Sequence, residues 1–308
     1  MNTPTFSKLK PIKKIFLEHR ILRVFTDIKK LKKLLIISSN SILTLFDINS
    51  FSNSQDLRIN NSNVIDADYL SEYCLLASID ETHNININKI TMNYFGNKFK
   101  TRCKHNFKTN HLDCRILFTG NRSQVLLLSN KIELWNLCHK RCEKSYIFSY
   151  NEKIKNLALN NNNNIFIAKT NSTLYFFHKD YPDFISKLNF RSTVNQVKWI
   201  TPSKFCLTTP NSSIYFYDLK NLKLPIKVLK FKKMNKILSF DIDYKNKNII
   251  ALDNRSKVTY YNMKTRSQLK YSTKLINMPL YNIFFINQGL HFITISEPKS
   301  FTIWNFQK

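Results

Sequence analysis

A short strand pattern recurs along this chain at a nearly constant spacing. It is an apolar run that ends in an aromatic residue and then a polar one, as in NSSIYFYDLKN at residues 211–221. The aromatic positions are Phe46, Trp135, Phe177, Tyr217, Tyr261 and Trp304. The gaps after Trp135 are 40 to 44 residues, and the first gap of 89 residues is two such periods. A seventh copy is therefore expected in SIDETHNININ (78–88), with Asn86 at the aromatic position. A period of about forty residues is typical of a propeller with four-stranded blades.

Each repeat contains short runs of alternating apolar and polar residues, which we name strands a to d. In the first repeat these runs are residues 21–28, 34–39, 42–48 and 56–59. We predict one domain, 1–308, with blades at about 21–60, 63–108, 111–150, 152–191, 192–232, 234–275 and 277–308. The last repeat has no run for strand d, whereas KKIFLEH (13–19), within the N-terminal segment 1–20, has no other partner. We predict that this strand completes the last blade and closes the ring, which removes an exposed sheet edge.

These repeats resemble the WD40 propeller family over nearly the whole chain. In that family, strand c ends in a Trp-Asp or similar pair, which matches Phe46-Asp47, Tyr217-Asp218 and Trp304-Asn305. The resemblance implies that the aromatic residue packs between blades and that an acid in the b–c turn joins a hydrogen-bonded network. Asp80 matches that acid, and Asn40, Asn171 and Asn211 occupy the same distance of six residues before the aromatic position. The chain has no Gly-His pair, so the buried histidine network of the family is largely absent.

The composition is that of a basic protein with few glycines. The chain of 308 residues has 48 Lys and Arg against 20 Asp and Glu, for a net charge of +28, and only 3 Gly. Asn is therefore expected at left-handed turn positions, which it tolerates better than most residues. Such an excess of positive charge favours a polyanion as partner, most often nucleic acid. A uniformly basic, solvated surface is the alternative.

Targeting and redox features point to an intracellular protein. The sequence has no apolar run of signal-peptide length at its start. It also has no apolar run of about 18 residues, the length that a membrane span requires. Its six cysteines have irregular spacing, which fits reduced thiols.

Catalytic and metal-binding motifs are weak or missing. No Gly-rich phosphate loop, GxSxG or HExxH occurs, and the acids of DADYLSE (66–72) are expected on a solvated turn or strand face. A zinc site could draw on two groups of ligands, and structural zinc needs four that converge on one point. The groups are Cys103, His105, His111 and Cys114, and Cys138, His139 and Cys142. The blade map places them on opposite faces, so we predict no enzyme activity, no metal and no cofactor.

Basic residues gather in the a–b and c–d connections, which open at one end of each blade; we call this the lower end. A rim of lysines suits phosphate contacts, which position a protein without reading sequence. The candidate RNA contacts are Lys29, Lys30, Lys32, Lys33, His139, Lys140, Arg141, Lys179, Lys220, Lys245, Lys247, Lys264 and Arg266. Polar loops that are lysine-rich for compositional reasons are the alternative interpretation.

A narrower resemblance concerns the order of blade features. LLASIDETHNININ (75–88), VLLLSNKIELWNL (125–137) and LPIKVLKFKKMNKILSFDIDYKNKNIIAL (224–252) follow one another as in the U3 small nucleolar RNA-associated proteins of the eighteenth type. The resemblance implies a non-enzymatic scaffold of the small-subunit processome, with ribonucleoprotein partners, a role in pre-rRNA processing and ribosome biogenesis, and a location in the nucleolus of the nucleus. The alternatives are a cytoplasmic propeller on the mature small ribosomal subunit or an initiation factor, and an RNA-independent hub such as a coat, nuclear-pore or ubiquitin-ligase adaptor.

Overall fold

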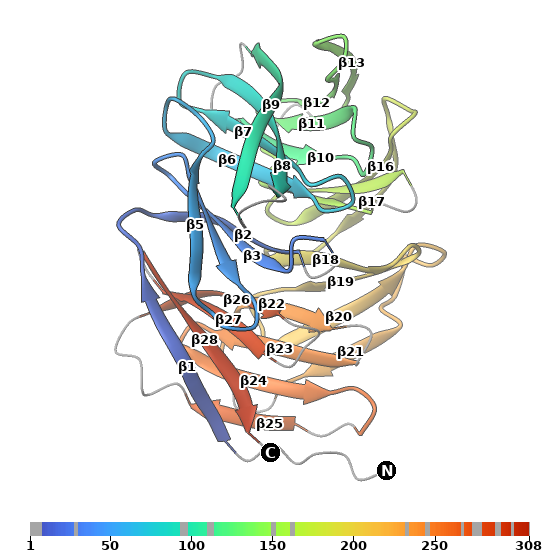
Figure 1. Cartoon of the computed structure of the whole chain (residues 1–308). Coiled ribbons are helices and arrows are strands. Elements are labelled where there is room, and N and C mark those ends of the chain that lie inside the picture. Colours follow the sequence, from blue (N-terminus) through green and yellow to red (C-terminus); the bar gives the residue numbers. More distant parts are fainter. Residues whose placement is uncertain are drawn as a thin grey trace. The chain divides into compact units, whose positions relative to one another are not determined.

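A computed structural model describes the chain as strands grouped in seven antiparallel sheets of four (Figure 1). It describes residues 8–27, 30–92, 98–109, 114–148, 152–160, 164–231, 234–243, 247–265, 268–272, 279–286, 291–296 and 299–307. The fold is that of a seven-bladed β-propeller of WD40 type, as the forty-residue period predicts.

The first four sheets follow the chain from strand a to strand d. Sheet 1 holds β2 (Ile21–Asp27), β3 (Lys33–Ser38), β4 (Ile42–Asp47) and β5 (Asn53–Arg58). Sheet 2 holds β6 (Val64–Leu70), β7 (Leu75–Asp80), β8 (Asn84–Met92) and β9 (Phe99–Lys108). Sheet 3 holds β10 (Arg115–Phe118), β11 (Gln124–Leu128), β12 (Ile132–Asn136) and β13 (Arg141–Tyr146). Sheet 4 holds β14 (Asn156–Leu159), β15 (Ile165–Lys169), β16 (Thr173–His178) and β17 (Phe184–Asn189).

The last three sheets repeat this order, except that the seventh takes its outer strand from the start of the chain. Sheet 5 holds β18 (Gln196–Thr201), β19 (Lys204–Thr208), β20 (Ser213–Asp218) and β21 (Lys227–Lys230). Sheet 6 holds β22 (Ile237–Asp243), β23 (Asn248–Asp253), β24 (Lys257–Asn262) and β25 (Gln268–Ser272). Sheet 7 holds β26 (Leu280–Ile286), β27 (His291–Ser296), β28 (Ser300–Gln307) and β1 (Lys8–Phe16).

The chain divides into two compact units, and each is described here by itself. The first unit covers 19–168 and 175–187, and the second covers 1–18, 169–174 and 188–308. The prediction of a single domain therefore stays a prediction.

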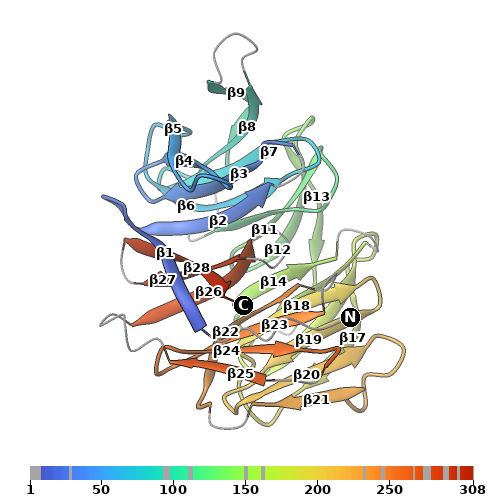
Figure 2. The same cartoon turned by 60° about the horizontal axis from the view of Figure 1, so that its bottom comes forward.

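The N-terminal strand completes sheet 7, which confirms the prediction made for the two ends of the chain. In the second unit, β1 lies antiparallel beside β28, with Lys8 opposite Gln307 and Phe16 opposite Ser300 (Figures 1 and 2). The strand is residues 8–16 and not the predicted 13–19. Its register shifts between Pro11 and Lys13. Proline has no N–H to donate to the ladder, so within sheets it is confined to edge strands and bulges such as this one.

Aromatic residues at the ends of the c strands join consecutive sheets. In the first unit, Trp135 stacks on Phe107 at 5.5 Å between ring centroids, and Phe177 meets Tyr146 edge-on at 5.6 Å. The second unit repeats the pattern with Tyr217 against Phe190 and Tyr261 against Phe231. In each pair, one ring lies at or just after the end of an outer strand and the other comes from the c strand of the next sheet. Phe46, near the end of β4, and Trp304, within β28, are also buried.

The register of sheet 2 corrects the predicted aromatic position. Asp80 accepts hydrogen bonds from the N–H groups two and four residues further on, at 3.1 and 2.9 Å, and Asp253 makes the same pair of bonds at 2.9 Å. Tyr261 follows Asp253 by eight residues, and Asn88 follows Asp80 by eight. Asn88, not Asn86, therefore holds the aromatic position. Its side chain is buried and donates to the carbonyl oxygen of Ile59 at 3.1 Å.

The same register moves the position that corresponds to Asp80 in other sheets. In sheets 1 and 5, the c-strand aromatics pair with Leu34 and Phe205, which places Ser38 and Thr209 at that position. The predicted Asn40 and Asn211 lie two residues later, inside the turn. In sheet 4, Phe177 stacks on Phe166, eleven residues earlier and not twelve, which places Thr170 at that position, one residue before Asn171. In sheets 1, 2 and 5 the aromatic position therefore follows the position of Asp80 by eight residues and not by six.

In the described part of the chain, left-handed turn positions are not filled mainly by asparagine, contrary to expectation. Among the described non-glycine residues with positive φ, one is Asn164, and the others include Lys32, Lys140 and Lys247, with φ of 51°, 52° and 56°. These three lysines lie in turns at the lower ends of their sheets.

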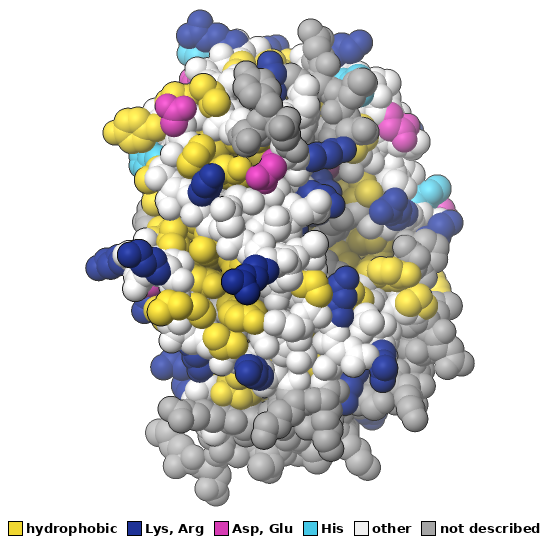
Figure 3. Space-filling model, turned by 180° about the vertical axis from the view of Figure 1, so that it is seen from behind, with side chains coloured by type: hydrophobic (Ala, Val, Ile, Leu, Met, Phe, Trp, Pro, Cys, Tyr) yellow, Lys and Arg dark blue, Asp and Glu magenta, His cyan; other side chains and the backbone are white. Residues whose placement is uncertain are grey.

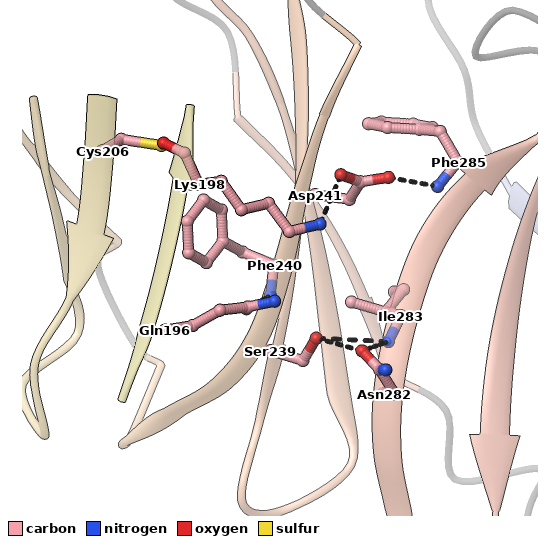
Figure 4. A network of polar contacts seen from close by, with 9 residues as sticks. All are labelled: Gln196, Lys198, Cys206, Ser239, Phe240, Asp241, Asn282, Ile283 and Phe285. Atoms are coloured by element: carbon pink, nitrogen blue, oxygen red, sulfur yellow. Dashed lines mark hydrogen bonds and ion pairs between the residues drawn. The ribbon is translucent and has the colours of Figure 1, made fainter. Parts of the chain in front are cut away.

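In each unit, a carboxylate joins the inner strands of three successive sheets. In the first unit, Arg23 Nε of β2 donates to Asp66 Oδ1 of β6 at 2.7 Å, and Asp66 Oδ2 accepts from the N–H of Ile116 at 3.2 Å. In the second unit, Lys198 of β18 pairs with Asp241 of β22 at 2.6 Å (Figure 4). Asp241 in turn accepts from the N–H of Phe285 on β26 at 2.8 Å.

These bridges overturn the expectation that Asp66 is solvated, whereas Asp68 is half-buried. Asp66 is buried, and Asp68 accepts from the N–H of Phe118 at 2.8 Å. Burial raises the pKa of Asp68 to about 7, although its backbone hydrogen bonds and the nearby Arg23 oppose the shift. Both acids come from an inner strand and accept N–H groups of the neighbouring inner strand, and Asp68 also lines a cavity of about 230 Å³. Glu72, in the turn after β6, is exposed as expected.

We expect the stability of the protein to fall between pH 5 and pH 8 because of Asp68. A folded-state pKa of about 7, above the usual value of 3.8, means that the folded chain holds the Asp68 proton more tightly. The contribution of this tighter proton binding to the free energy of unfolding is therefore fully present below pH 4. It is lost as the pH rises through 7. Asn at position 68 keeps an acceptor for Phe118 without the charge. Asp68→Asn should thus exceed wild type in stability by about 1–2 kcal/mol at pH 8 and by little at pH 5. Thermal unfolding at both pH values, with exposed Asp56→Asn as control, measures this. An equal difference at the two pH values would contradict it.

Candidate functional site

In the first unit, the described basic candidates lie at the lower ends of their sheets. Lys30 and Lys32 are in the turn between β2 and β3, and His139 and Lys140 are in the turn between β12 and β13. Lys33, Arg141 and Lys179 stand at or beside the adjoining strand ends. Lys29 lies outside the described residues. The a–b and c–d turns thus carry these side chains as predicted from the blade map, and their role as RNA contacts stays a prediction.

In the second unit, three of the five candidates are described. Lys220 follows β20, Lys247 precedes β23 and Lys264 follows β24, and all three are exposed. Lys245 and Arg266 lie outside the described residues.

Two lysines of sheet 1, Lys30 and Lys33, are already engaged within the protein. Lys33 Nζ pairs with Asp47 at 2.9 Å. Hydrogen bonds from the Ser50 N–H and from Lys33 lower the pKa of Asp47 to about 2, so this pair stays charged. Lys30 Nζ donates to the carbonyl oxygen of Glu72 in the neighbouring turn. Lys33 therefore adds little net charge for a ligand, whereas Lys30 holds the turn that leads to Tyr73.

A cavity of about 330 Å³ opens between sheets 2 and 3, within the first unit. Its apolar walls are the side chains of Leu75 and Ile87. Its polar lining consists of Tyr73, Lys89, Lys104, His105, Arg122, Ser123 and Cys138. None of the described residues that line it is acidic. Sequence analysis missed this cluster because its members come from five separate segments and form no local motif.

The electrostatics of this cavity favour an anion. Lys89, Lys104 and Arg122 are exposed, and the Arg122 guanidinium lies 5.9 Å from the centre of the Tyr73 ring. Burial, and then the positive charges of Lys140 and Lys104, lower the pKa of His105. The effect of Lys140 shows that the predicted basic turn after β12 contributes to the field of the cavity. Three cations beside a partly exposed tyrosine can bind a phosphate and stack a planar group.

The cavity also corrects one expectation about the zinc ligands. His105 and Cys138, predicted on opposite faces, line the same cavity. They meet because His105 lies within β9, opposite Ile87, and not in the connection that follows this strand. His111 lies outside the described residues. Among the residues that the structure describes, no three His, Cys, Asp or Glu side chains gather as metal ligands.

Charge on the face seen in Figure 3 is diffuse. In the view of Figure 3, Lys and Arg side chains are spread over the surface among apolar patches, and acidic side chains are few. The cavity between sheets 2 and 3 differs from this background because several cations converge on one hollow beside an aromatic ring. None of the described segments is a helix that could cross a membrane.

Comparisons with known proteins identify the fold and leave the family open. No protein-family model matches the sequence, and no curated protein matches it. The crystal structure of Chaetomium thermophilum Raptor superposes on 97% of this chain with a TM-score of 0.76 and 13% sequence identity. This chain spans 29% of the length of that protein. In all, 1824 chains of solved structures match, so the likeness establishes the propeller fold alone.

Proposed function

We propose that this protein is a non-enzymatic interaction scaffold that binds single-stranded RNA at the cavity between sheets 2 and 3. The observation that carries the proposal is the convergence of Lys89, Lys104 and Arg122 beside Tyr73. Single-stranded nucleic acid is bound by positive grooves that follow the backbone and by aromatic rings on which bases stack. The net charge of +28 adds a sequence-independent attraction.

Charge reversal inside the cavity tests this site directly. We expect Lys89→Glu/Lys104→Glu/Arg122→Glu to weaken binding of a fluorescein-labelled 20-nucleotide RNA by more than tenfold in anisotropy titrations. The slope of log K against log salt should fall by about 2, since each phosphate contact on a single strand contributes roughly 0.7. Tyr73→Ala should weaken binding by about tenfold through lost stacking.

A matched control variant distinguishes the effect of the cavity residues on RNA binding from the effect of the net charge. Lys153, Lys155 and Lys187 are exposed, lie in the same unit and do not line the cavity. Their triple change to Glu alters the net charge by the same amount, and we expect at most a threefold effect. Equal losses for the two triple variants would assign binding to the net charge and refute the site.

We also propose that the RNA belongs to a ribonucleoprotein assembly of the small-subunit processome, with the protein in the nucleolus. The order of blade features and the basic surface support this narrower function. Purification after crosslinking, followed by RNA sequencing, should recover small-subunit precursor RNA. Recovery of mature ribosomal RNA alone favours the cytoplasmic ribosome or initiation-factor alternative, and recovery of no RNA favours the interaction hub.

A further inference from the structure

A second cavity lies between sheets 5 and 6, within the second unit, and its lining is apolar. It has a volume of about 130 Å³. It is lined by Ile200, Lys204, Phe216, Ile226, Lys227, Ile242 and Met263. By strand register, Phe216 corresponds to Ile87, which lines the basic cavity, because each precedes the position of the c-strand aromatic. The same place in two repeats thus holds a basic hollow in one and an apolar hollow in the other.

The surface beside this cavity is also apolar. Leu224, Ile226 and Val228 are 71%, 54% and 39% exposed, which places three aliphatic side chains in five residues of chain. They lie on β21 and just before it, and β21 is the outer strand of sheet 5. Ile226 lines the cavity, whereas Val228, which pairs with Tyr215, faces the other side of sheet 5. Exposed apolar side chains beside an apolar hollow mark an interaction site.

Lysines are numerous in the segments that form this apolar group. Lys204 and Lys227 line the cavity, and Lys220, Lys223 and Lys230 are exposed on the same loop and strand. Asp218, opposite Lys204, accepts from the N–H of Lys220 at 3.0 Å through its Oδ1, and Asp241, next to Ile242, pairs with Lys198. The rim is therefore positive around an apolar centre, which is complementary to a segment with the opposite arrangement.

We infer that the cavity between sheets 5 and 6 binds a short peptide segment of a partner protein, with a bulky apolar residue at its centre and acidic residues on both sides. The volume favours a peptide over other apolar surfaces. A cavity of about 150 Å³ accommodates a benzene molecule, so 130 Å³ is close to the size of one Leu or Met side chain. A flat lipid surface has no need of such a hollow, and RNA gains nothing from its apolar walls.

This inference is independent of RNA binding and is tested without knowledge of the partner. The probe is a phage-displayed library of random 12-residue peptides selected against the full chain. We expect enriched sequences with one or two bulky apolar residues flanked by Asp or Glu, and micromolar binding when they are resynthesised with fluorescein. Raising NaCl from 50 to 500 mM should weaken binding by about tenfold, because the flanking contacts are exposed ion pairs.

Two exposed isoleucines provide a matched pair of variants. Ile226 is 54% exposed beside the cavity, and Ile185 is 58% exposed on β17 in the other unit. We expect Ile226→Asp to weaken peptide binding by at least tenfold and Ile185→Asp to leave it unchanged. Both variants should keep the wild-type thermal midpoint, since neither side chain is part of the core. The double variant Lys204→Glu/Lys227→Glu should weaken the binding of acidic peptides. It should leave RNA binding at the cavity between sheets 2 and 3 unchanged.

Four outcomes would overturn the inference. One is enrichment of no apolar-acidic consensus, and another is equal binding by wild type and Ile226→Asp. A third is binding of anionic phospholipid vesicles that Ile226→Asp abolishes, with no peptide binding, which would assign the surface to a membrane. The fourth is a wild-type dimer that Ile226→Asp dissociates, which would make a second copy of the chain the occupant.

Discussion

Deleting residues 1–16 should leave the protein largely unfolded or aggregated at 25 °C. The deletion removes β1, which pairs with β28 from Lys8–Gln307 to Phe16–Ser300. Sheet 7 would keep three strands, and β28 would present an open edge to solvent. Each ladder hydrogen bond contributes about 0.5–1.5 kcal/mol, so the loss of the strand amounts to several kcal/mol. That approaches the whole stability of an ordinary domain, about 5–15 kcal/mol. Circular dichroism and size-exclusion chromatography measure the result.

Two further samples decide whether the missing strand is the cause. Deletion of residues 1–7 leaves every described strand intact and should preserve the wild-type thermal midpoint. A synthetic peptide of residues 8–20, added in excess to the 1–16 deletion, should restore a cooperative transition, because an extended peptide can add to an open sheet edge. If the 1–16 deletion protein has the thermal midpoint of wild type, β1 is dispensable. The pairing of β1 with β28 would then not be needed for the stability of sheet 7.

The fold follows from local signals that repeat, and repetition is why it could be predicted. Six aromatic positions set the period, and each blade supplies its own turns and alternating strands. The register of sheet 2 could not be fixed in this way because Asn88 stands where the other sheets have an aromatic ring. Only the pairing of Asn88 with Leu76, and the bonds of Asp80 to its own turn, reveal the alignment.

The candidate sites depend on contacts between repeats, which a local pattern does not contain. Lys89, Lys104 and Arg122 belong to different strands and turns of two sheets, and only packing brings them to one hollow. Asp66 and Asp68 alternate with apolar residues as a half-exposed strand would, yet each accepts an N–H from the neighbouring inner strand. The basic turns were predictable because their lysines are consecutive in the sequence.

Asp66→Ala should be among the most destabilising single substitutions in the first unit. The Asp66 side chain is 7% exposed, pairs with Arg23 at 2.7 Å and accepts the Ile116 N–H at 3.2 Å. Its removal leaves a partly buried guanidinium and a buried N–H without this partner. Removing one member of a buried pair costs about 3–5 kcal/mol, and Arg23, at 35% exposure, recovers part of its hydration. We therefore expect a loss of about 3 kcal/mol in urea denaturation.

The equivalent bridge of the second unit supplies the comparison. Asp241 makes the same two kinds of bond but is 20% exposed, so Asp241→Ala should cost less, about 1–2 kcal/mol. Asp66→Asn keeps an acceptor for Ile116 and should fall between wild type and Asp66→Ala. In a double-mutant cycle, Arg23→Met should recover at least 1 kcal/mol of the Asp66→Ala loss, since the unpaired charge disappears. A loss below 0.5 kcal/mol for Asp66→Ala, or no coupling with Arg23, would contradict this prediction. The bridge would then add no stability beyond the apolar packing of Ile116 and its neighbours, and that packing alone would hold the inner strands together.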